Sequence, residues 1–411
     1  MVDIRSISVE EVPAFVKAMT GPFAFDLPDE EEERSAMLGR FGQIFEHRRA
    51  RCAFDGAVMV GTLGAFSLDL TVPGNRVACA GTTMVTVQAS HRRRGVLRAL
   101  MDAHLEEAHQ NGDAIAALWA SDSAIYRRFG FGMASVDTTI EIGRPHVSFG
   151  RLAPAPDTVT VVDAETAASV FPPFFDAVRG DSPGFYGRSD AWWTNRRLRD
   201  APDSRNGRSK YRFAITGSPD HVTGYVQFRV KEGWEDEHGA HQVQVIELIG
   251  STPESWAGLW AFVTAHDLAA EIKAVHRSED DPLFDFLAAP RRARRVAGDG
   301  LWVRLLDVPA ALEARRYRSP GRLTLEVHDP MDRVSGIYSL ETDESGAAEC
   351  RPSTDRADLE LDLEDLGACY LGRSRFAALS RAGRLNGSMD ALRTADVMFG
   401  WDRAPWCPEV F

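Results

Sequence analysis

The stretch VTVQASHRRRGVLRALMDAHLEEAHQNGDAIAALWASDSAIYRRFGFG, from Val85 to Gly132, decides the fold. It predicts a strand that ends near Val87, a basic turn, and a long helix that begins near Gly95. A second apolar strand is expected at Ala114–Trp119, followed by a short helix that bears Tyr126. Strands interleaved with helices in this way predict a mixed α/β sheet.

The basic turn between the first strand and the helix has the chemistry of an anion-binding site. Four basic side chains at His91–Arg94 precede Gly95 at the expected helix start. The free N–H groups of a first helical turn point outward, and the helix dipole favours negative charge there. Gly95 has no Cβ to keep the backbone away from a ligand. The turn therefore suits a pyrophosphate, and a solvated charge run is the alternative reading.

Length and composition bound the class of protein. The 411 residues predict two or three domains, and 44% hydrophobic with 26% charged residues is typical of a soluble globular chain. No apolar run approaches the ~20 residues that a membrane span needs. The first residues, MVDIRSISVEEVPAF, lack the features of a secretory signal. Five scattered cysteines without a CxxC pair argue against disulfides and zinc. We expect a cytoplasmic protein without a metal.

The net charge of −13 excludes nucleic acid as an expected partner, because surfaces that bind phosphate backbones are basic. An acidic surface instead raises the local concentration of cations. Much of the acid, as in Asp29–Glu33, is expected to lie on solvated helical faces. The charge is nonetheless consistent with a small polycationic substrate.

The same rhythm of helices and strands occurs twice, which predicts domains at residues 1–150 and 151–298. The first has expected helices at Val9–Met19 and Glu31–Glu46 before its strands, and the second has expected helices at Ala164–Val178 and Ser189–Leu198. In the second copy the loop corresponding to HRRRG is Gly250–Trp256, which has no basic residue and contains an acid. A pyrophosphate would meet no cation there, so the second copy is expected to have lost cofactor binding.

A different pattern begins near Gly300 and predicts a third domain at residues 299–411. An apolar strand at Gly300–Val308 leads into a helix, and alternating strands are expected at Arg322–His328 and Ser335–Glu341. Three further helices precede the last residue, Phe411. This small α+β unit resembles the sterol-carrier-protein-like domain.

The basic loop, Arg92-Arg93-Arg94-Gly95-Val96-Leu97, resembles the pyrophosphate loop of the GNAT superfamily of acetyl-CoA-dependent N-acetyltransferases. Leu97 departs from the small residue that the superfamily has at this position. Two tandem GNAT-like units followed by a sterol-carrier-like unit resemble the Eis (enhanced intracellular survival) family over essentially the whole chain. The most specific similarities are three segments, Ser90–Gly95, Ala120–Gly132 and Gly300–Arg304 with Asp307–Arg315.

The resemblance implies acetyl transfer from acetyl-CoA to amines of polyamine-like substrates, including aminoglycosides, at several positions of one molecule. It also implies a homohexamer. A protein or peptide lysine acetyltransferase is an alternative, and a lipid-binding protein that uses the C-terminal domain is another. No residue pattern in the sequence decides the physiological acceptor.

Cofactor contacts are expected along the first strand, at the basic loop and after the second strand. Backbone groups of the strand would bind the pantetheine arm and polarise the acetyl carbonyl, as in the resembling family. Ser121 matches a family position near the cofactor, and Asp122 beside it is also a candidate helix cap. The expected cofactor-binding residues are Val85, Thr86, Val87, Arg93, Arg94, Gly95, Val96, Leu97, Arg98, Ser121 and Asp122.

Tyr126 is the expected general acid. A phenol of ordinary pKa about 10 is protonated at neutral pH and lies close to a thiol's ~8.5, so it can protonate the leaving thiolate. The resemblance implies that the C-terminal carboxylate is the general base, which here belongs to Phe411. The tail before it, WCPEVF, is apolar enough to bury its last ring and fix the carboxylate. Packing of Tyr126 beside Phe129 is the alternative for the tyrosine.

Substrate contacts are the least specific part of the pattern. Phe25 and Asp26 would offer an aromatic wall and a carboxylate to an ammonium group. Glu409 would add a second negative charge, and the flexible thioether of Met84 would accept substrates of varied shape.

Overall fold

The computed structural model describes residues 2–151, 153–236 and 238–411. Met1, Leu152 and Glu237, which the expected domain ranges include, lie outside the described residues. The chain forms two compact units. Of the described residues, the first unit contains 2–135, 299–405 and 410–411, and the second contains 406–409 and those between 136 and 298.

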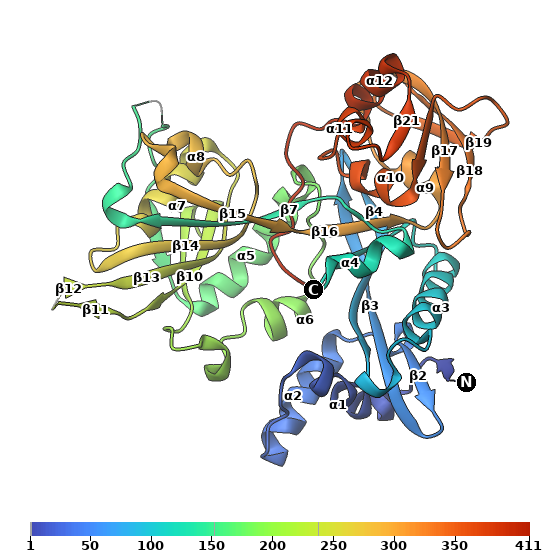
Figure 1. Cartoon of the computed structure of the whole chain (residues 1–411). Helices are drawn as coiled ribbons and strands as arrows, with labels where there is room; N and C mark the ends of the chain where they lie inside the picture. The colour runs from blue at the N-terminus through green and yellow to red at the C-terminus, as the bar shows by residue number, and fades with distance from the viewer. Residues whose placement is uncertain (1, 152, 237) are drawn as a thin grey trace. The chain divides into compact units, whose positions relative to one another are not determined.

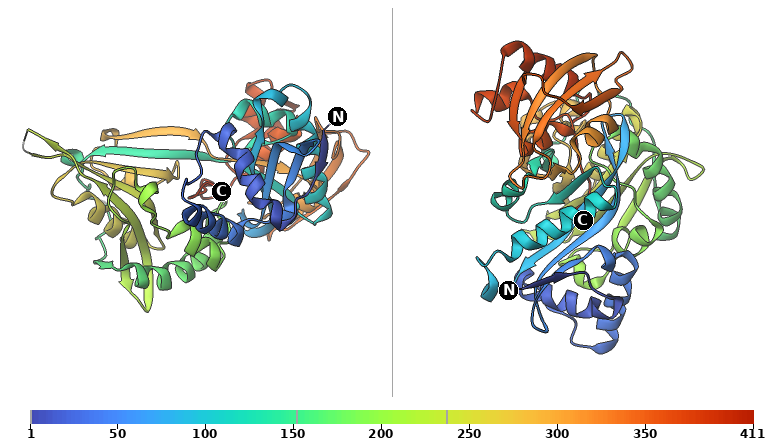
Figure 2. Two further views of the ribbon diagram at one scale, coloured as in Figure 1. Left: turned by 90° about the horizontal axis from the view of Figure 1, so that it is seen from below. Right: turned by 90° about the vertical axis from the view of Figure 1, so that its right-hand side faces the viewer.

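A mixed seven-stranded sheet organises the first part of the first unit. Its strand order is β1-β2-β3-β4-β5-β16-β6, and β4–β5 is its parallel pair. The parallel pair is connected by the long helix α3, which packs against β3 and β4 (Figures 1 and 2). The strands are β1 Asp3–Arg5, β2 Arg51–Asp55, β3 Val58–Val72, β4 Asn75–Val87, β5 Ile115–Trp119, β6 Gly132–Met133 and β16 Leu301–Leu305.

Helices α1 and α2 lie between β1 and β2 in the chain, and α3 forms the crossover between β4 and β5. Amphipathic spacing puts Val96, Leu100, Met101 and Leu105 of α3 into the core beside β3 and β5. The helical elements are η1 Val9–Glu11, α1 Val12–Phe23, α2 Glu31–Ile44, η2 His47–Arg49, η3 Ala89–His91, α3 Val96–Gln110, α4 Ser123–Tyr126 and η4 Arg127–Phe129.

The second unit contains another seven-stranded mixed sheet, in the order β15-β7-β14-β13-β10-β9-β8. As in the first sheet, an antiparallel pair (β10–β13) is followed by a parallel pair (β13–β14) with a helix, α7, between its strands. The strands are β7 Val136–Gly143, β8 Val159–Val162, β9 Arg212–Ser218, β10 His221–Lys231, β13 His241–Gly250, β14 Ala269–Arg277 and β15 Ala293–Asp299. A short antiparallel pair, β11 Trp234–Glu235 and β12 His238–Gly239, stands between β10 and β13 in the chain.

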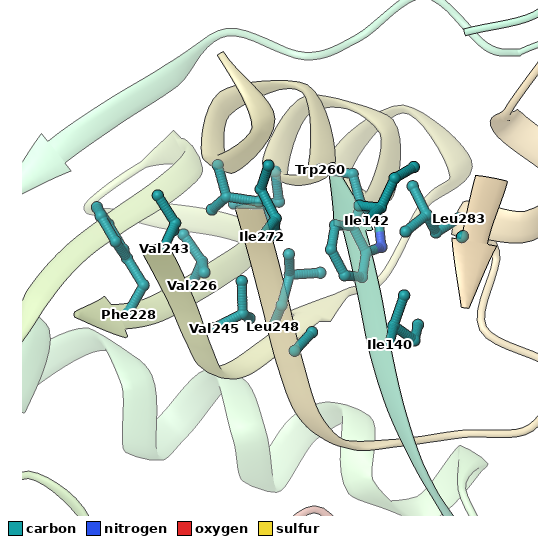
Figure 3. Packing of buried hydrophobic residues seen from close by; sticks show 14 of the residues in the cluster. Ile140, Ile142, Val226, Phe228, Val243, Val245, Leu248, Trp260, Ile272 and Leu283 are labelled. Atoms are coloured by element: carbon teal, nitrogen blue, oxygen red, sulfur yellow. The ribbon is translucent and has the colours of Figure 1, made fainter. Parts of the chain in front are cut away.

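One core of the second unit lies between this sheet and α7, and a second cluster packs α5 against β9 and β10. Figure 3 shows side chains of the first core, among them Val243, Val245 and Ile272 of the central strands and the fully buried Trp260 of α7. The helix expected at Ser189–Leu198 consists of α6 followed by a π-helical turn. The helical elements are η5 Arg144–His146, α5 Ala164–Val178, η6 Arg179–Asp181, α6 Asp190–Trp192, η7 Trp193–Arg197, η8 Pro202–Arg205, α7 Pro253–Thr264, α8 Leu283–Phe286 and η9 Pro290–Arg292.

The C-terminal part of the first unit is a five-stranded sheet in the order β19-β18-β17-β20-β21 with four helices (Figure 1). The strand expected at Gly300–Val308 is β16, but it pairs with β5 and β6 in the first sheet rather than with these strands. The elements are α9 Val308–Ala314, β17 Gly321–His328, β18 Gly336–Thr342, β19 Ala348–Pro352, β20 Leu359–Asp362, α10 Leu363–Tyr370, α11 Phe376–Arg381, β21 Leu385–Gly387 and α12 Met389–Phe399.

Candidate active site

Strand β4 has an open edge at its C-terminal end. Its parallel pairing with β5 runs from Cys79 to Thr82 and goes no further among the described residues. The strand itself continues to Val87 and stays paired with β3 on its other side. The two parallel strands therefore diverge, and backbone N–H and C=O groups near Val85–Val87 face the gap. Such an edge can bind an extended ligand by main-chain hydrogen bonds.

A β-bulge marks the place where β4 leaves β5. Thr62 of β3 is paired with Thr86 and Gly64 with Thr83, so Met84 and Val85 together oppose one residue of β3. Met84 has a φ of 53°, and its carbonyl accepts a hydrogen bond from the Thr62 hydroxyl at 2.8 Å. Positive φ at a non-glycine residue is strained, and bulges often redirect backbone groups at functional sites.

The basic loop leads directly into α3. Gly95 is the N-cap residue with a φ of 79°, a conformation that glycine adopts without steric cost. The first backbone bond within the helix joins the Ala99 N–H to the Gly95 carbonyl at 3.0 Å. The preceding amides, at Val96–Arg98, consequently point out of the helix end. Arg92–Arg94 are exposed around this end, and Arg93 also has a positive φ of 61°.

Tyr126 is at the end of the one-turn helix α4, which follows β5. The Asp122 carboxylate caps this helix by accepting from the Ala124 N–H at 3.1 Å. The Tyr126 side chain is buried, with 5% of the residue exposed, and its ring lies edge-on to Phe131. Burial raises the pKa of Tyr126 above its ordinary value, and a hydrogen bond with Ser121 opposes the rise. The phenol therefore keeps its proton at neutral pH.

A cavity of about 710 Å³ joins the open edge, the basic loop and Tyr126. Every expected cofactor residue except Arg94 lines it, as does Tyr126. The lining residues that the sequence did not single out for the cofactor are Pro22, Phe23, His91, Arg92, Ile125, Arg128 and Phe129. His91 and Arg92 belong to the basic run, but no sequence pattern predicts that the end of α1 lines the cavity.

Three of the four expected substrate residues belong to the first unit, and none lines this cavity. Phe25 and Asp26 directly follow α1 and are exposed. Met84 stands at the bulge, packed against the cluster that contains Phe45. These residues stay predictions.

Glu409, the fourth, belongs to the second unit and is buried. Its carboxylate accepts from the Trp192 indole at 3.1 Å and from the Tyr186 hydroxyl at 3.3 Å. Arg188 is paired with it at 3.1 Å and Arg196 at 3.5 Å. Two guanidinium groups thus already neutralise this carboxylate, and its substrate role stays a prediction.

Phe411 lies at the bulged strand of the first unit. Its terminal oxygen accepts a hydrogen bond from the Thr83 hydroxyl at 3.1 Å. The residue is 5% exposed, and its ring lies close enough to Gly81 that a Cβ there would be 3.4 Å from it. The last residue is therefore held beside Thr83, which comes two positions before Val85 of the open edge.

The second unit repeats the bulge and the divergence, but its open edge is occupied by its own side chain. Parallel pairing of β13 with β14 ends at Val245 and Ala274. Beyond that point the fully buried Arg277 donates to the Leu248 carbonyl at 2.8 Å and is paired with Asp281 at 2.6 Å. The Arg277 guanidinium therefore occupies the Leu248 carbonyl, to which an extended ligand would otherwise bind.

Two features of the second unit also reduce the number of free amides at the N-terminus of α7. Pro253, the first residue of α7, has no N–H, and the Thr252 hydroxyl accepts from the Ser255 N–H at 3.1 Å. These two features remove amides that could bind an anion. The loss of cofactor binding in this copy stays a prediction.

The diverging strands, the arginine-lined helix start and the buried tyrosine all lie within residues 3–134, a range that one family model matches. Family models of the acetyltransferase (GNAT) domain match residues 3–134 and 184–305, and a sterol carrier protein domain model matches residues 308–408. These matches confirm the expected fold class, two tandem GNAT domains followed by a sterol-carrier-type domain.

Relatives that match most or all of the chain show which family of acetyltransferases it belongs to. An uncharacterized N-acetyltransferase of Streptomyces coelicolor is 37% identical over 86% of both chains. The N-acetyltransferase Eis of Mycobacterium tuberculosis is 32% identical over 84% of both. The crystal structure of Eis1 from Mycobacterium abscessus has a TM-score of 0.85 at 28% identity and covers 100% of both chains. The chain belongs to the Eis family of N-acetyltransferases, which confirms the resemblance and the enzyme class.

Two further observations concern membranes and metals. In residues 2–151, 153–236 and 238–411, no helix is long and apolar enough to cross a membrane. Within the same part of the chain, no group of three or more His, Cys, Asp or Glu side chains could hold a metal ion.

Proposed function

We propose that the enzyme transfers the acetyl group of acetyl-CoA to amines of small polycationic substrates, of the aminoglycoside or polyamine type and at several positions. The observation that carries the proposal is the cavity in which the open edge of β4, the start of α3 and Tyr126 meet. Acetyl-CoA is the donor that GNAT acetyltransferases use. The net charge of −13 supports a cationic acceptor and argues against nucleic acid as a partner.

The chain's own groups fit each part of the donor. The pyrophosphate would lie at the amides of Val96–Arg98, with Arg93, Arg94 and Arg98 supplying positive charge. The pantetheine arm would follow Val85–Val87, where backbone groups lack a second strand. A backbone N–H of this edge would then polarise the acetyl carbonyl. Ser121 and Asp122, which also line the cavity, would complete the contacts.

Tyr126 would protonate the departing thiolate. Because the pKa of Tyr126 is raised, its hydroxyl stays protonated across the physiological pH range. It would transfer this proton to the thiolate that forms in the reaction. The Ser121 side chain, which bonds with the hydroxyl, would orient it.

The C-terminal carboxylate of Phe411 would accept the proton of the attacking amine. Its bond from Thr83 and the packing of its ring at Gly81 support this role, because a base must be held in place. Phe25, Asp26, Met84 and Glu409 are proposed to contact the substrate. The homohexamer and the cytoplasmic location remain proposals that rest on the family resemblance.

Free-thiol release from acetyl-CoA, measured with polyamines, aminoglycosides and a lysine-rich peptide, tests the proposal. We expect turnover with several polyamines or aminoglycosides, and mass spectrometry should find more than one acetyl group on some products. Turnover with the lysine-rich peptide alone would instead assign the enzyme to protein substrates. No turnover with any amine by a folded protein would contradict the broad-acceptor proposal.

A further inference from the structure

The Tyr126 segment, residues 123–131, is held by groups from outside the GNAT motifs of the sequence. A fully buried ion pair joins Arg304 of β16 to Asp329, which follows β17 in the sterol-carrier-type domain. Its two hydrogen bonds measure 2.9 and 2.7 Å. The same guanidinium donates to the Phe129 carbonyl at 2.6 Å, three residues after the tyrosine. Arg304 therefore links the catalytic segment to the C-terminal domain.

The Asp329 carboxylate cannot move freely, because the loop around it also binds it. The N–H groups of Met331 and Arg333 donate to it at 3.0 Å, and that of Val334 at 3.2 Å. Burial opposes ionisation, but Arg304 and these amides lower the pKa of Asp329 below its ordinary value. The ion pair is therefore charged and fixed on both sides, and bidentate pairing adds directional precision.

A second contact holds the same segment at the residue after Tyr126. The Arg127 guanidinium donates to the Glu364 carboxylate of α10 at 3.1 Å. Arg384 donates to the same carboxylate oxygen. Arg127 is partly exposed whereas Glu364 is largely buried, so the anchor lies on the sterol-carrier-type side.

The glycines of the run Phe129-Gly130-Phe131-Gly132 make this close approach possible. A Cβ at Gly130, whose φ is 74°, would lie 2.2 Å from Arg304 Nη1. A Cβ at Gly132 would lie 1.7 Å from the Glu364 backbone oxygen. Both glycines thus give space to the groups that hold the segment, which explains a motif that the proposed chemistry does not use.

We propose that Arg304, Asp329 and Glu364 are positioning residues for Tyr126, and that the sterol-carrier-type domain acts in acetyl transfer as its brace. The inference rests on the proposed function, in which Tyr126 is the general acid. Helix α4 has only four residues, too few to hold a side chain by its own hydrogen bonds. Proton transfer needs the hydroxyl within hydrogen-bond reach of the thiolate, and a shift of about 1 Å costs about 10²-fold in rate.

The test is a double-mutant cycle with Glu364→Ala and Tyr126→Phe. Glu364→Ala should lower kcat by about 10-fold, because the segment is loosened on one side only, and should leave the KM for acetyl-CoA unchanged. In the Tyr126→Phe enzyme the same substitution should have little further effect on kcat, since the group that it positions is absent. The matched control is Glu341→Ala, which removes an exposed ion pair to Arg322 in the same domain and should change kcat less than about twofold.

The outcomes separate the brace from the proposed function. An unchanged kcat in Glu364→Ala, or an equal fold-loss with and without the Tyr126 hydroxyl, would overturn the brace. A Tyr126→Phe enzyme with full kcat would instead contradict the general-acid proposal itself. If Glu364→Ala does not fold, as judged by its thermal unfolding, Arg127→Met removes the same contact from the partly exposed side, and the same cycle applies.

Discussion

Gly95 and Gly112 flank the two ends of α3, and both have a positive φ, of 79° and 83°. A Cβ at either position would meet nothing within 4 Å, so substitution would strain the backbone without a clash. Only Gly95 lines the cavity. The pair therefore separates the conformational role of a glycine from its role in ligand binding.

Alanine at each glycine gives the first prediction. Gly95→Ala and Gly112→Ala should each lower the free energy of unfolding by about 1–2 kcal/mol, the cost of a left-handed conformation with a Cβ. Only Gly95→Ala should also raise the dissociation constant of acetyl-CoA, by about 10-fold, because the helix amides would shift. Calorimetry of unfolding and of binding measures both. Equal loss of acetyl-CoA affinity in the two variants would contradict a pyrophosphate site at Gly95.

The pH dependence of kcat tests the protonation state of Tyr126. Burial raises its pKa above the ordinary value of about 10, so the acid form persists as the pH rises. We expect kcat at saturating substrates to show no decline from Tyr126 between pH 7 and about 9.5. A decline in that window that disappears in Tyr126→Phe would show an ionising phenol and contradict the raised pKa.

At the scale of elements, the first turn of α10 contains a carboxyl group whose ionisation opposes folding. Asp365 has a side chain only 1% exposed, and burial raises its pKa to about 6, although Arg384 at 2.7 Å lowers it. Between the ordinary pKa and 6 the folded chain binds more protons than the unfolded chain. Stability from this group is therefore fully present below pH 4 and is lost as the pH rises through 6.

Asp365→Asn removes this pH-linked loss. The free energy of unfolding of the variant, minus that of the wild type, should rise by about 2 kcal/mol between pH 4 and pH 7. Chemical denaturation at both pH values measures it. A pH-independent difference would mean that Asp365 titrates near its ordinary pKa in the folded protein.

Local periodicity predicted β4, α3 and β5, because the amphipathic pattern of α3 and the apolar run of β5 depend on neighbours in sequence. It missed several strands, among them β7, Val136–Gly143, and β15, Ala293–Asp299. The residues of β15 are mostly exposed and include adjacent arginines. Local periodicity also predicted β16 as a strand but not its partners, since pairing with β5 joins residues almost 200 positions apart.

Part of the site is also encoded by local sequence. The strand–loop–helix motif around Gly95 is local, so its cavity-lining residues could be predicted. Two other features depend on tertiary contacts that no sequence period encodes. Phe23 of α1 lines the cavity, and Asp329 holds the Tyr126 segment through Arg304.

At the scale of the whole molecule, the proposed chemistry needs a free carboxylate at the C-terminus and involves no group at the N-terminus. The terminal oxygen of Phe411 binds Thr83 of the bulged strand, whereas the N-terminal strand β1 lies at the edge of the first sheet. An extension of a few residues at the C-terminus would replace the terminal carboxylate by an amide, which cannot accept the amine proton.

A Gly-Ser extension after Phe411 should therefore lower kcat by at least about 10²-fold while acetyl-CoA still binds. The same extension at the N-terminus is the control and should leave kcat unchanged. Thiol release and calorimetric binding measure the two properties. Full activity of the C-terminally extended enzyme would exclude the terminal carboxylate as the base.

Acetyl transfer in the cavity of the first GNAT domain, with Tyr126 as the acid, is tested by kcat for thiol release with a polyamine acceptor. The measurement compares the wild type with Tyr126→Phe and includes the acetyl-CoA dissociation constant of each. We expect kcat to fall by about 10²-fold or more while the dissociation constant changes less than about threefold. A Tyr126→Phe enzyme that binds acetyl-CoA normally and keeps the wild-type kcat would contradict the role of Tyr126 as the acid.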